Sequence, residues 1–341
     1  MTPRRIALDH LNGAEAAALL LGGRLEDLLI DSDLPRPGAI YRAIADRPVK
    51  GQGGMFLRTP DGSAFLRQIK GLAPGQPLLV QVTGYAEPGK ALLVTTKLLF
   101  KSRYAIITPD APGLNLSRSI REDEQRDRLL EIAHAGMAGS GMGLILRSAC
   151  AEATEAEIAE DIQSMLDLAD AVLGDATGEA PEKLTEGDGP HVLAWRDWTE
   201  RADVITDAGC FAALGVLDQI EALRDPRVDL PGGGSIHIEP TRALVAVDVN
   251  TGGDASLAAG LKANLAMARD LPRQLRLRGL GGQITLDLAP MPKQDRRTFE
   301  TTLRAAFRHD LTETALAGWT PLGHFELQRK RDRQPLSEVL K

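Results

Sequence analysis

Two strand-like runs that end alike constrain the fold of this chain more than any other feature. The run ALVAVDVN carries Asp248, and the run QITLDLAP carries Asp287 at the matching place. Each run alternates apolar residues with smaller or polar ones, as a half-buried strand does. The segment between them predicts a helix that stops at the glycines of GLGG, because its apolar residues recur at helical spacing. These residues are Leu257, Leu261, Leu265 and Ala268.

A strand–helix–strand unit of this length predicts a right-handed crossover between parallel strands. Asp248 and Asp287 should then lie at one edge of an α/β sheet, where such sheets bind their ligands. With the amide of Asn250 beside them, two convergent carboxylates predict a binding site for one hard cation such as Mg²⁺. The alternative that the residues leave open is a pair of ordinary loop-capping acids.

A second part of the chain predicts a small β-barrel. Between about Gly38 and Val94, turn sequences separate five short strand-like runs: AIYRAI, GGMFLR, SAFLRQI, PLLVQVTGY and ALLVTT. Five strands at this spacing are typical of oligonucleotide-binding barrels. Phe56 and Phe65 could stack bases on such a barrel, although core packing is the favoured interpretation. Lys90, in a later turn, could equally be a solvated turn residue.

Other segments predict ordinary elements around these two parts. Gly22-Gly23 between apolar runs predicts a hairpin rather than one helix over Ala16–Ile30. A strand is expected near Ser102–Ile107. Helices are expected at Glu152–Leu173, Phe211–Leu223 and Pro292–His309, and a loop at Gly174–Pro190.

The net charge of −7 hides an uneven distribution. Glu152–Asp188 holds twelve acidic residues and one lysine, a balance of −11, so the remainder carries −7 + 11 = +4. A basic surface elsewhere therefore remains compatible with the composition. The candidates are Arg147-Ser148, after the strand-like GMGLIL, and the basic run Arg329–Arg333 that includes Arg331. Each could bind phosphate; the alternatives are an arginine after an edge strand and a solvated tail.

Several classes of protein are disfavoured by what the sequence lacks. The start MTPRRIALDH leads into no apolar signal region, and no apolar run is long enough for a membrane span, so a soluble cytoplasmic protein with no membrane partner is expected. Cys150 and Cys210 form no CxxC motif, and no HxxxH pair occurs. The GGGS turn lacks the lysine of a phosphate-binding loop, and there is no GxSxG motif.

The stretches TRALVAVDVNTGGD and NLAMARDLPRQLRLRGLGGQITLDLAPM closely resemble the catalytic region of the ribonuclease E and ribonuclease G family. GMGLILRSA is similar to that family's 5′-end sensor, and FELQRKR to its arginine-bearing segment after the catalytic core. The resemblance implies an endoribonuclease that hydrolyses single-stranded RNA to 5′-phosphate and 3′-hydroxyl ends, with possible stimulation by a 5′-monophosphate.

The family fold implies an α/β (α+β) protein of several subdomains. A ribonuclease-H-like part is expected at 1–35 and again at 187–228. An S1/OB-like barrel is expected at 36–100 and a 5′-sensor region with the acidic helix at 101–186. A deoxyribonuclease-I-like catalytic α/β subdomain would occupy 229–341.

Matching the motifs residue by residue implies roles for ten side chains. Asp248 and Asp287 match the Mg²⁺-binding aspartates, and Asn250 matches the asparagine beside the scissile phosphate. The remaining matches concern RNA. Phe56, Phe65, Lys90, Arg329 and Arg331 would contact it, and Arg147 with Ser148 would form the 5′-phosphate sensor, Ser replacing the family's Thr.

The chain also departs from the family pattern. The CPxCxG zinc-link motif does not occur, which leaves the oligomeric state open, and the loop TGGDAS after Asn250 is short and lacks the family's arginines. Pro290 stands where the family often has an acid. A rival hypothesis is therefore a non-catalytic RNA-binding protein with the same fold. A carboxylate-pair glycosidase is disfavoured, because no aromatic sugar platform is visible.

Overall fold

The structure is a computed structural model that describes residues 2–49, 53–67, 71–254 and 256–340. The end of the predicted strand SAFLRQI and Ala255 of the TGGDAS loop lie outside the described residues. The chain forms two compact units: unit 1 comprises Met1–Ser32 and Ala202–Lys341, and unit 2 comprises Asp33–Arg201. Among the described residues, no helix has both the length and the apolar character needed to cross a membrane.

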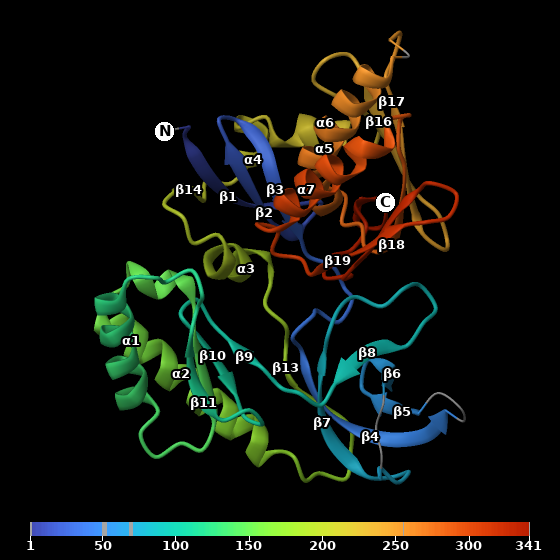
Figure 1. The fold of residues 1–341 in the computed structure, drawn as a ribbon. Coiled ribbons are helices and arrows are strands. Elements are labelled where there is room, and N and C mark those ends of the chain that lie inside the picture. Colours follow the sequence, from blue (N-terminus) through green and yellow to red (C-terminus); the bar gives the residue numbers. More distant parts are fainter. Residues whose placement is uncertain (1, 50–52, 68–70, 255, 341) are drawn as a thin grey trace. The chain divides into compact units, whose positions relative to one another are not determined.

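Unit 1 contains two sheets (Figure 1). The first has the strand order β14-β1-β2-β3, made of β1 (Arg4–Leu11), β2 (Ala14–Leu21), β3 (Arg24–Ile30) and β14 (Asp203–Ile205). The hairpin predicted around Gly22-Gly23 is confirmed, because β2 and β3 pair antiparallel on either side of it. Both glycines have positive φ, of 59° and 83°, which a tight turn between strands requires.

The second sheet has the order β15-β16-β17-β18-β20-β19. Its strands are β15 (Arg227–Asp229), β16 (Ser235–Pro240), β17 (Val245–Asn250), β18 (Gly282–Asp287), β19 (Thr314–Trp319) and β20 (Phe325–Arg329). The predicted parallel pairing of β17 and β18 around a helix is confirmed. The helices are α4 (Cys210–Ala213), α5 (Val216–Ala222), α6 (Leu257–Leu277), η2 (Lys293–Asp295), α7 (Arg296–Phe307) and α8 (Leu336–Val339).

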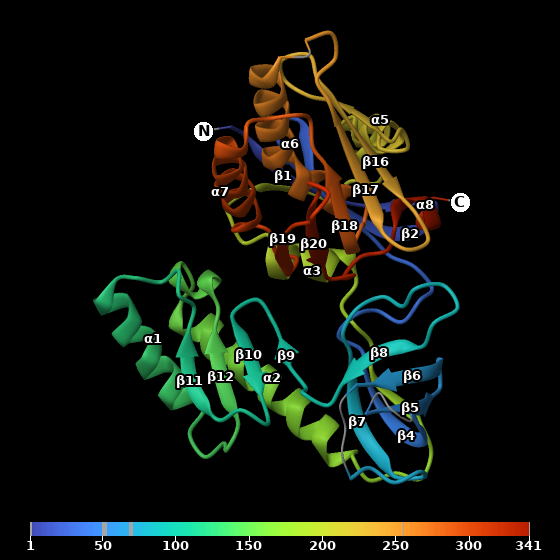
Figure 2. The same ribbon diagram turned by 45° about the vertical axis from the view of Figure 1, so that its right-hand side comes forward.

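Helices α6 and α7 cover one face of this sheet, as Figure 2 shows. The inner face of α6 differs from the predicted stripe: Leu257 is 53% exposed, whereas Met267 and Leu271 are fully buried. The predicted single helix Phe211–Leu223 is also wrong. Gly215, with a left-handed φ of 67°, separates α4 from α5.

Unit 2 contains a closed barrel and an α/β layer. Strand β4 (Ile40–Val49) pairs with both β5 and β7, so β4-β5-β6-β8-β7 closes on itself. The other strands are β5 (Gly54–Thr59), β6 (Gly62–Leu66), β7 (Pro77–Val82) and β8 (Leu92–Thr95). The predicted five-stranded barrel is thereby confirmed. The predicted loop 174–190 instead contains β13 (Glu182–Thr185), which pairs with β4.

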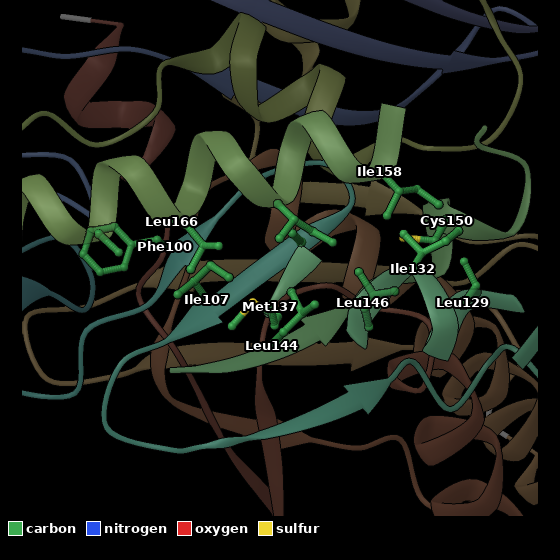
Figure 3. Packing of buried hydrophobic residues seen from close by; sticks show 14 of the residues in the cluster. Phe100, Ile107, Leu129, Ile132, Met137, Leu144, Leu146, Cys150, Ile158 and Leu166 are labelled. Carbon is green, nitrogen blue, oxygen red and sulfur yellow. The ribbon is translucent and has the colours of Figure 1, made fainter. Parts of the chain in front are cut away.

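The α/β layer of unit 2 has the strand order β11-β12-β10-β9. Its elements are β9 (Phe100–Lys101), β10 (Ala105–Thr108), β11 (Gly113–Leu116), α1 (Asp123–Gly136), β12 (Gly143–Leu146), η1 (Ser148–Ala151), α2 (Glu155–Gly174) and α3 (Pro190–Asp197). Figure 3 shows Leu166 of α2 beside Ile107 of the sheet and Ile158 of the same helix near Cys150. Thr154 and Glu157 form a capping box that fixes the start of α2.

Candidate active site

Asp248 and Asp287 lie side by side on neighbouring strands of unit 1. They are register partners in the parallel pair β17–β18. Paired strands lie about 4.8 Å apart and register partners point to the same side of the sheet, so the two carboxylates share one face. Both aspartates are exposed, and the side chain of Asp287 keeps 66% of its surface.

The strand pattern explains why the carboxylates face away from the helices. Val247 and its register partner Leu286 are buried in the core with α6 and α7. Because successive side chains of a strand alternate in direction, the next residues, Asp248 and Asp287, point to the opposite face. The same alternation that predicted the strands therefore places the two acids.

Asn250 lies on the same face, two residues after Asp248. Its amide Nδ2 donates a 2.6 Å hydrogen bond to Oδ2 of Asp248, which orients that carboxylate. The end of β17 is packed tightly, since a Cβ atom at Gly234 would lie 2.7 Å from the carbonyl oxygen of Asn250. The glycine-rich turn before β16 thus allows the backbone that carries Asn250 to approach.

The donor set fits a hard cation that keeps part of its water shell. Two exposed carboxylates and an amide offer oxygen ligands, and Mg²⁺ prefers one or two carboxylates with several waters to a closed cage. Within residues 2–49, 53–67, 71–254 and 256–340, no group of three or more His, Cys, Asp or Glu side chains is arranged to hold a metal ion. A Mg²⁺ site here would therefore depend on Asp248 and Asp287.

Two residues that contact Asp287 or the loop after it were not anticipated from the sequence. His324 Nδ1 lies 3.3 Å from Oδ1 of Asp287. Asn264 of α6 is fully buried, and its amide both donates to the carbonyl of Ala289 at 2.8 Å and accepts from its N–H at 3.0 Å. Asn264 therefore fixes the loop that directly follows Asp287. A polar residue on the inner face of a helix was the available signal.

Phe56 and Phe65 lie on the outer surface of the barrel, so their assignment to the core is wrong. They are register partners on β5 and β6, and their ring centroids are 5.3 Å apart. Their sequence neighbours point inward, whereas both phenylalanines are half-buried. The guanidinium of Arg47 lies 5.1 Å from the centroid of the Phe56 ring. Lys90 lies in an exposed turn, and its Nζ pairs with Glu87 at 2.7 Å.

Arg147 and Ser148 follow the end of β12, which is an inner strand between β11 and β10 and not an edge strand. Ser148 is exposed. Arg147 is held by Asp197 at 2.7 Å and by the carbonyl of Ser102 at 2.6 Å. Burial alone would raise the pKa of Asp197, but hydrogen bonds and charge from Arg196 and Arg147 lower it below its ordinary value.

The basic run Arg329–Arg333 is not a solvated tail. Arg329 is 2% exposed, and its Nη1 lies 2.9 Å from a buried oxygen of Asp310 and 2.9 Å from the Thr314 hydroxyl. This placement corrects the expectation that Arg329 contacts RNA, because its guanidinium has almost no surface. Arg331 is half-buried, and its guanidinium lies against Gly282.

Arg333 and Arg329 belong to a series of alternating charges inside unit 1, which we call the buried charge chain: Arg333–Asp27–Arg276–Asp310–Arg329. Arg333 contacts Asp27 with two nitrogens, one at 3.0 Å. Arg276 lies 3.9 Å from Asp27 and 3.4 Å from Asp310. Four segments of the sequence, around Asp27, Arg276, Asp310 and the run Arg329–Arg333, therefore meet through this chain.

Comparison with known proteins agrees with the resemblance. The chain matches the family described as "Ribonuclease E/G family" over residues 100–209 and 196–332. It is 29% identical over 395 residues to ribonuclease E of Synechocystis sp. (strain ATCC 27184 / PCC 6803 / Kazusa), covering 99% of this chain and 58% of that protein. It is 28% identical over 382 residues to ribonuclease E of Nostoc sp. (strain PCC 7120 / SAG 25.82 / UTEX 2576), covering 95% and 56%.

Ribonuclease G of Escherichia coli (strain K12) is 28% identical over 392 residues, which cover 95% of this chain and 79% of that protein. The chain thus spans little more than half the length of the two ribonuclease E relatives and more of the ribonuclease G relative. Since the family match extends over more than half of the sequence, this chain belongs to the ribonuclease E/G family.

Proposed function

We propose that this chain is a Mg²⁺-dependent endoribonuclease that hydrolyses single-stranded RNA to 5′-phosphate and 3′-hydroxyl ends. The observation that carries the proposal is the register pairing of Asp248 with Asp287 on one exposed sheet face. Membership of a family whose relatives are named ribonuclease E and ribonuclease G supports it.

Each residue of the site has a separate role in the proposed reaction. Asp248 and Asp287 would hold Mg²⁺, which when bound polarises a phosphoryl oxygen and acidifies water at the site. Asn250 fixes the direction of the Asp248 carboxylate through its 2.6 Å hydrogen bond. Asn264, through the backbone of Ala289, limits the movement of the segment after Asp287. Carboxylates held in this way need little rearrangement when substrate binds.

The barrel offers a surface for RNA. The paired rings of Phe56 and Phe65 lie outside the barrel, where bases can stack on them without sequence preference. Arg47 beside Phe56 adds positive charge for a phosphate backbone, and the exposed Lys90 would do so by exchanging Glu87 for phosphate. Arg331 is a further candidate for RNA contact. Binding should therefore weaken as salt concentration rises.

A 5′-monophosphate could stimulate cleavage through Arg147 and Ser148. Ser148 is exposed, and the side chain of Arg147, which pairs with Asp197, keeps 22% of its surface. A phosphate there would compete with Asp197 for Arg147.

We further propose an identity for each subdomain. Residues 1–35 together with 187–228 would form the ribonuclease-H-like part, and 36–100 the S1 barrel. Residues 101–186 would form the 5′ sensor, and 229–341 the deoxyribonuclease-I-like catalytic part.

The test is cleavage of a 5′-labelled single-stranded oligoribonucleotide in Mg²⁺ or in EDTA. Wild type should cleave only in Mg²⁺, while Asp248→Asn and Asp287→Asn should lose cleavage and keep RNA affinity measured in EDTA. The matched control is Glu239→Gln, which removes an exposed carboxylate from the same sheet face and should still cleave. Equal cleavage by wild type and both aspartate variants would refute the site assignment.

The same assay separates the enzyme from its rival. A non-catalytic RNA-binding protein with this fold would bind the oligonucleotide in Mg²⁺ and leave it intact. Analysis of product ends completes the test, because a 3′-phosphate or 2′,3′-cyclic end would contradict hydrolysis to a 3′-hydroxyl.

A further inference from the structure

A pocket of about 310 Å³ lies in unit 1 and contains none of the residues assigned above. The start of β3, helix α5 with the residues after it, β15 and the C-terminal half of α6 line it. Pockets of 300 Å³ and above accommodate small organic ligands. Because none of the proposed RNA-cleavage residues lines this pocket, a ligand bound in it would be distinct from the RNA at Asp248 and Asp287.

The pocket is lined both by apolar residues, which we call its apolar wall, and by cationic residues. Leu25 and Leu277, which are 1% and 2% exposed overall, contribute to the apolar wall together with Leu223 and Val228. Four arginines supply the charge: Arg24, Arg227, Arg273 and Arg278.

Three of these arginines have carboxylate partners. Arg24 and Arg273 share Asp270, at 2.5 Å and 2.8 Å, and Arg227 lies 2.8 Å from Asp229. Their charges are thus already balanced in part. Arg24 and Arg227 nevertheless keep 56% and 55% of their side-chain surface, so both can turn toward a ligand.

Arg278 differs from the other three. It is 6% exposed, and its guanidinium donates to Oε1 of Gln274 and to the carbonyl of Asp225 at 3.0 Å. Within the part of the chain that the structure describes, no carboxylate forms an ion pair with it. Burial, with repulsion from Arg273, lowers the pKa of Arg278 to about 10, although the charges of Asp270 and Asp225 act in the opposite direction. A buried guanidinium with no direct ion pair is costly, so an anion in this pocket would relieve part of that cost.

We propose that this pocket binds a nucleoside monophosphate. The phosphate monoester supplies the missing negative charge, for which guanidinium groups are well suited because they donate parallel hydrogen bonds to its oxygens. The flat base matches the apolar wall in chemistry, and the pocket volume is within the range that accommodates small organic ligands. An inorganic anion would satisfy the arginines alone, and an uncharged nucleoside would satisfy only the apolar wall.

The experiment is isothermal titration calorimetry of the whole chain with AMP, inorganic phosphate and adenosine. EDTA is present throughout, so that metal-dependent binding at Asp248 and Asp287 is excluded. AMP should bind, phosphate should bind more weakly, and adenosine should give no detectable heat. Arg227→Gln and Arg24→Gln should each weaken AMP binding about tenfold, the effect of losing one charge-assisted contact.

Arg304→Gln is the matched control, because it removes an exposed arginine on α7 that does not line the pocket. It should bind AMP as wild type does, and circular dichroism should show that all three variants are folded. Asp248→Asn should also keep AMP binding. The proposal is overturned if AMP does not bind, if adenosine or phosphate binds as tightly as AMP, if both pocket variants bind normally, or if Asp248→Asn abolishes binding.

Discussion

Removing one carboxylate from the buried charge chain should destabilise unit 1 strongly. Asp27 is 3% exposed, and Arg333 contacts it with two nitrogens. In Asp27→Asn the guanidinium of Arg333 would retain the Leu28 carbonyl at 2.9 Å but lose its ionic partner. Stranding a buried charge in this way costs about 3–5 kcal/mol. Because asparagine keeps the volume and one acceptor oxygen, we expect about 3 kcal/mol.

The assay is a urea titration in which unfolding is monitored by pulsed hydrogen–deuterium exchange. Peptides from β3 and β20 give the free energy of unfolding of unit 1 separately from that of unit 2. Lys330→Gln is the matched control, because Lys330 is an exposed cation of the same basic run. It should change the free energy of unfolding by no more than about 0.5 kcal/mol. The double variant Asp27→Asn/Arg333→Met should cost less than the sum of its single variants, since neither charge is then stranded.

Asp27→Asn should therefore cost far more than Lys330→Gln, and the double variant should cost less than the sum of its single variants. If Asp27→Asn costs less than about 1 kcal/mol, the pair behaves as an exposed ion pair does. Strict additivity in the double variant would likewise show that the two side chains are not coupled. Either result would refute the claim that the buried charge chain holds β3 to the C-terminal segment.

Further predictions concern pH, RNA affinity and backbone conformation. Burial alone would raise the pKa of Asp27, but Arg333 and Arg276 hold it below its ordinary value of 3.8. Its contribution to stability is therefore fully present above pH 3.8 and lost as the pH falls through the lower folded-state pKa, so Asp27→Asn should flatten the acid limb of a stability–pH curve. Phe56→Ala and Phe65→Ala should each reduce oligoribonucleotide affinity in EDTA by about 1–3 kcal/mol in fluorescence anisotropy; unchanged affinity in both would remove the barrel rings from the RNA surface. Gly279→Ala should lower stability by more than about 1 kcal/mol in thermal melts, because φ is +62° and a Cβ atom would meet a backbone carbonyl, whereas Gly253→Ala, with open space around it, should not.

The sequence predicted those elements whose signal is local. Turn residues and alternating strands predicted the hairpin β2–β3, the barrel and the parallel pair β17–β18, all of which the structure contains. The register pairing of Asp248 with Asp287 agrees with the same alternation, since each acid follows a buried apolar residue. The local pattern was sufficient to predict these strands and the shared face of the two acids, because successive side chains of a strand point to opposite faces.

Features that depend on distant partners were not predictable in the same way. Strand β13 lies in a segment of loop-like composition and forms only because β4, some 140 residues earlier, offers it an edge. The inner face of α6 was misjudged because Gly260 and Asn264 are buried there, where Gly260 gives room to the carbonyl of Pro290. The spacing of apolar residues along a helix does not show that a glycine or an asparagine lies on its buried face.

The pairing of β13 with β4 indicates that part of unit 2 can fold as a separate domain. Thr185 lies opposite Ile40, and Nη1 of Arg36 donates to the carbonyl of Gly187 at 3.0 Å, so the chain enters and leaves residues 36–187 at neighbouring positions. A module whose ends are adjacent can be inserted into a host loop, or cut out of it, with little disturbance to its own folding. Residues 36–187 therefore have neighbouring ends, as a separable domain has, and a gene fragment that encodes them alone should yield a folded product.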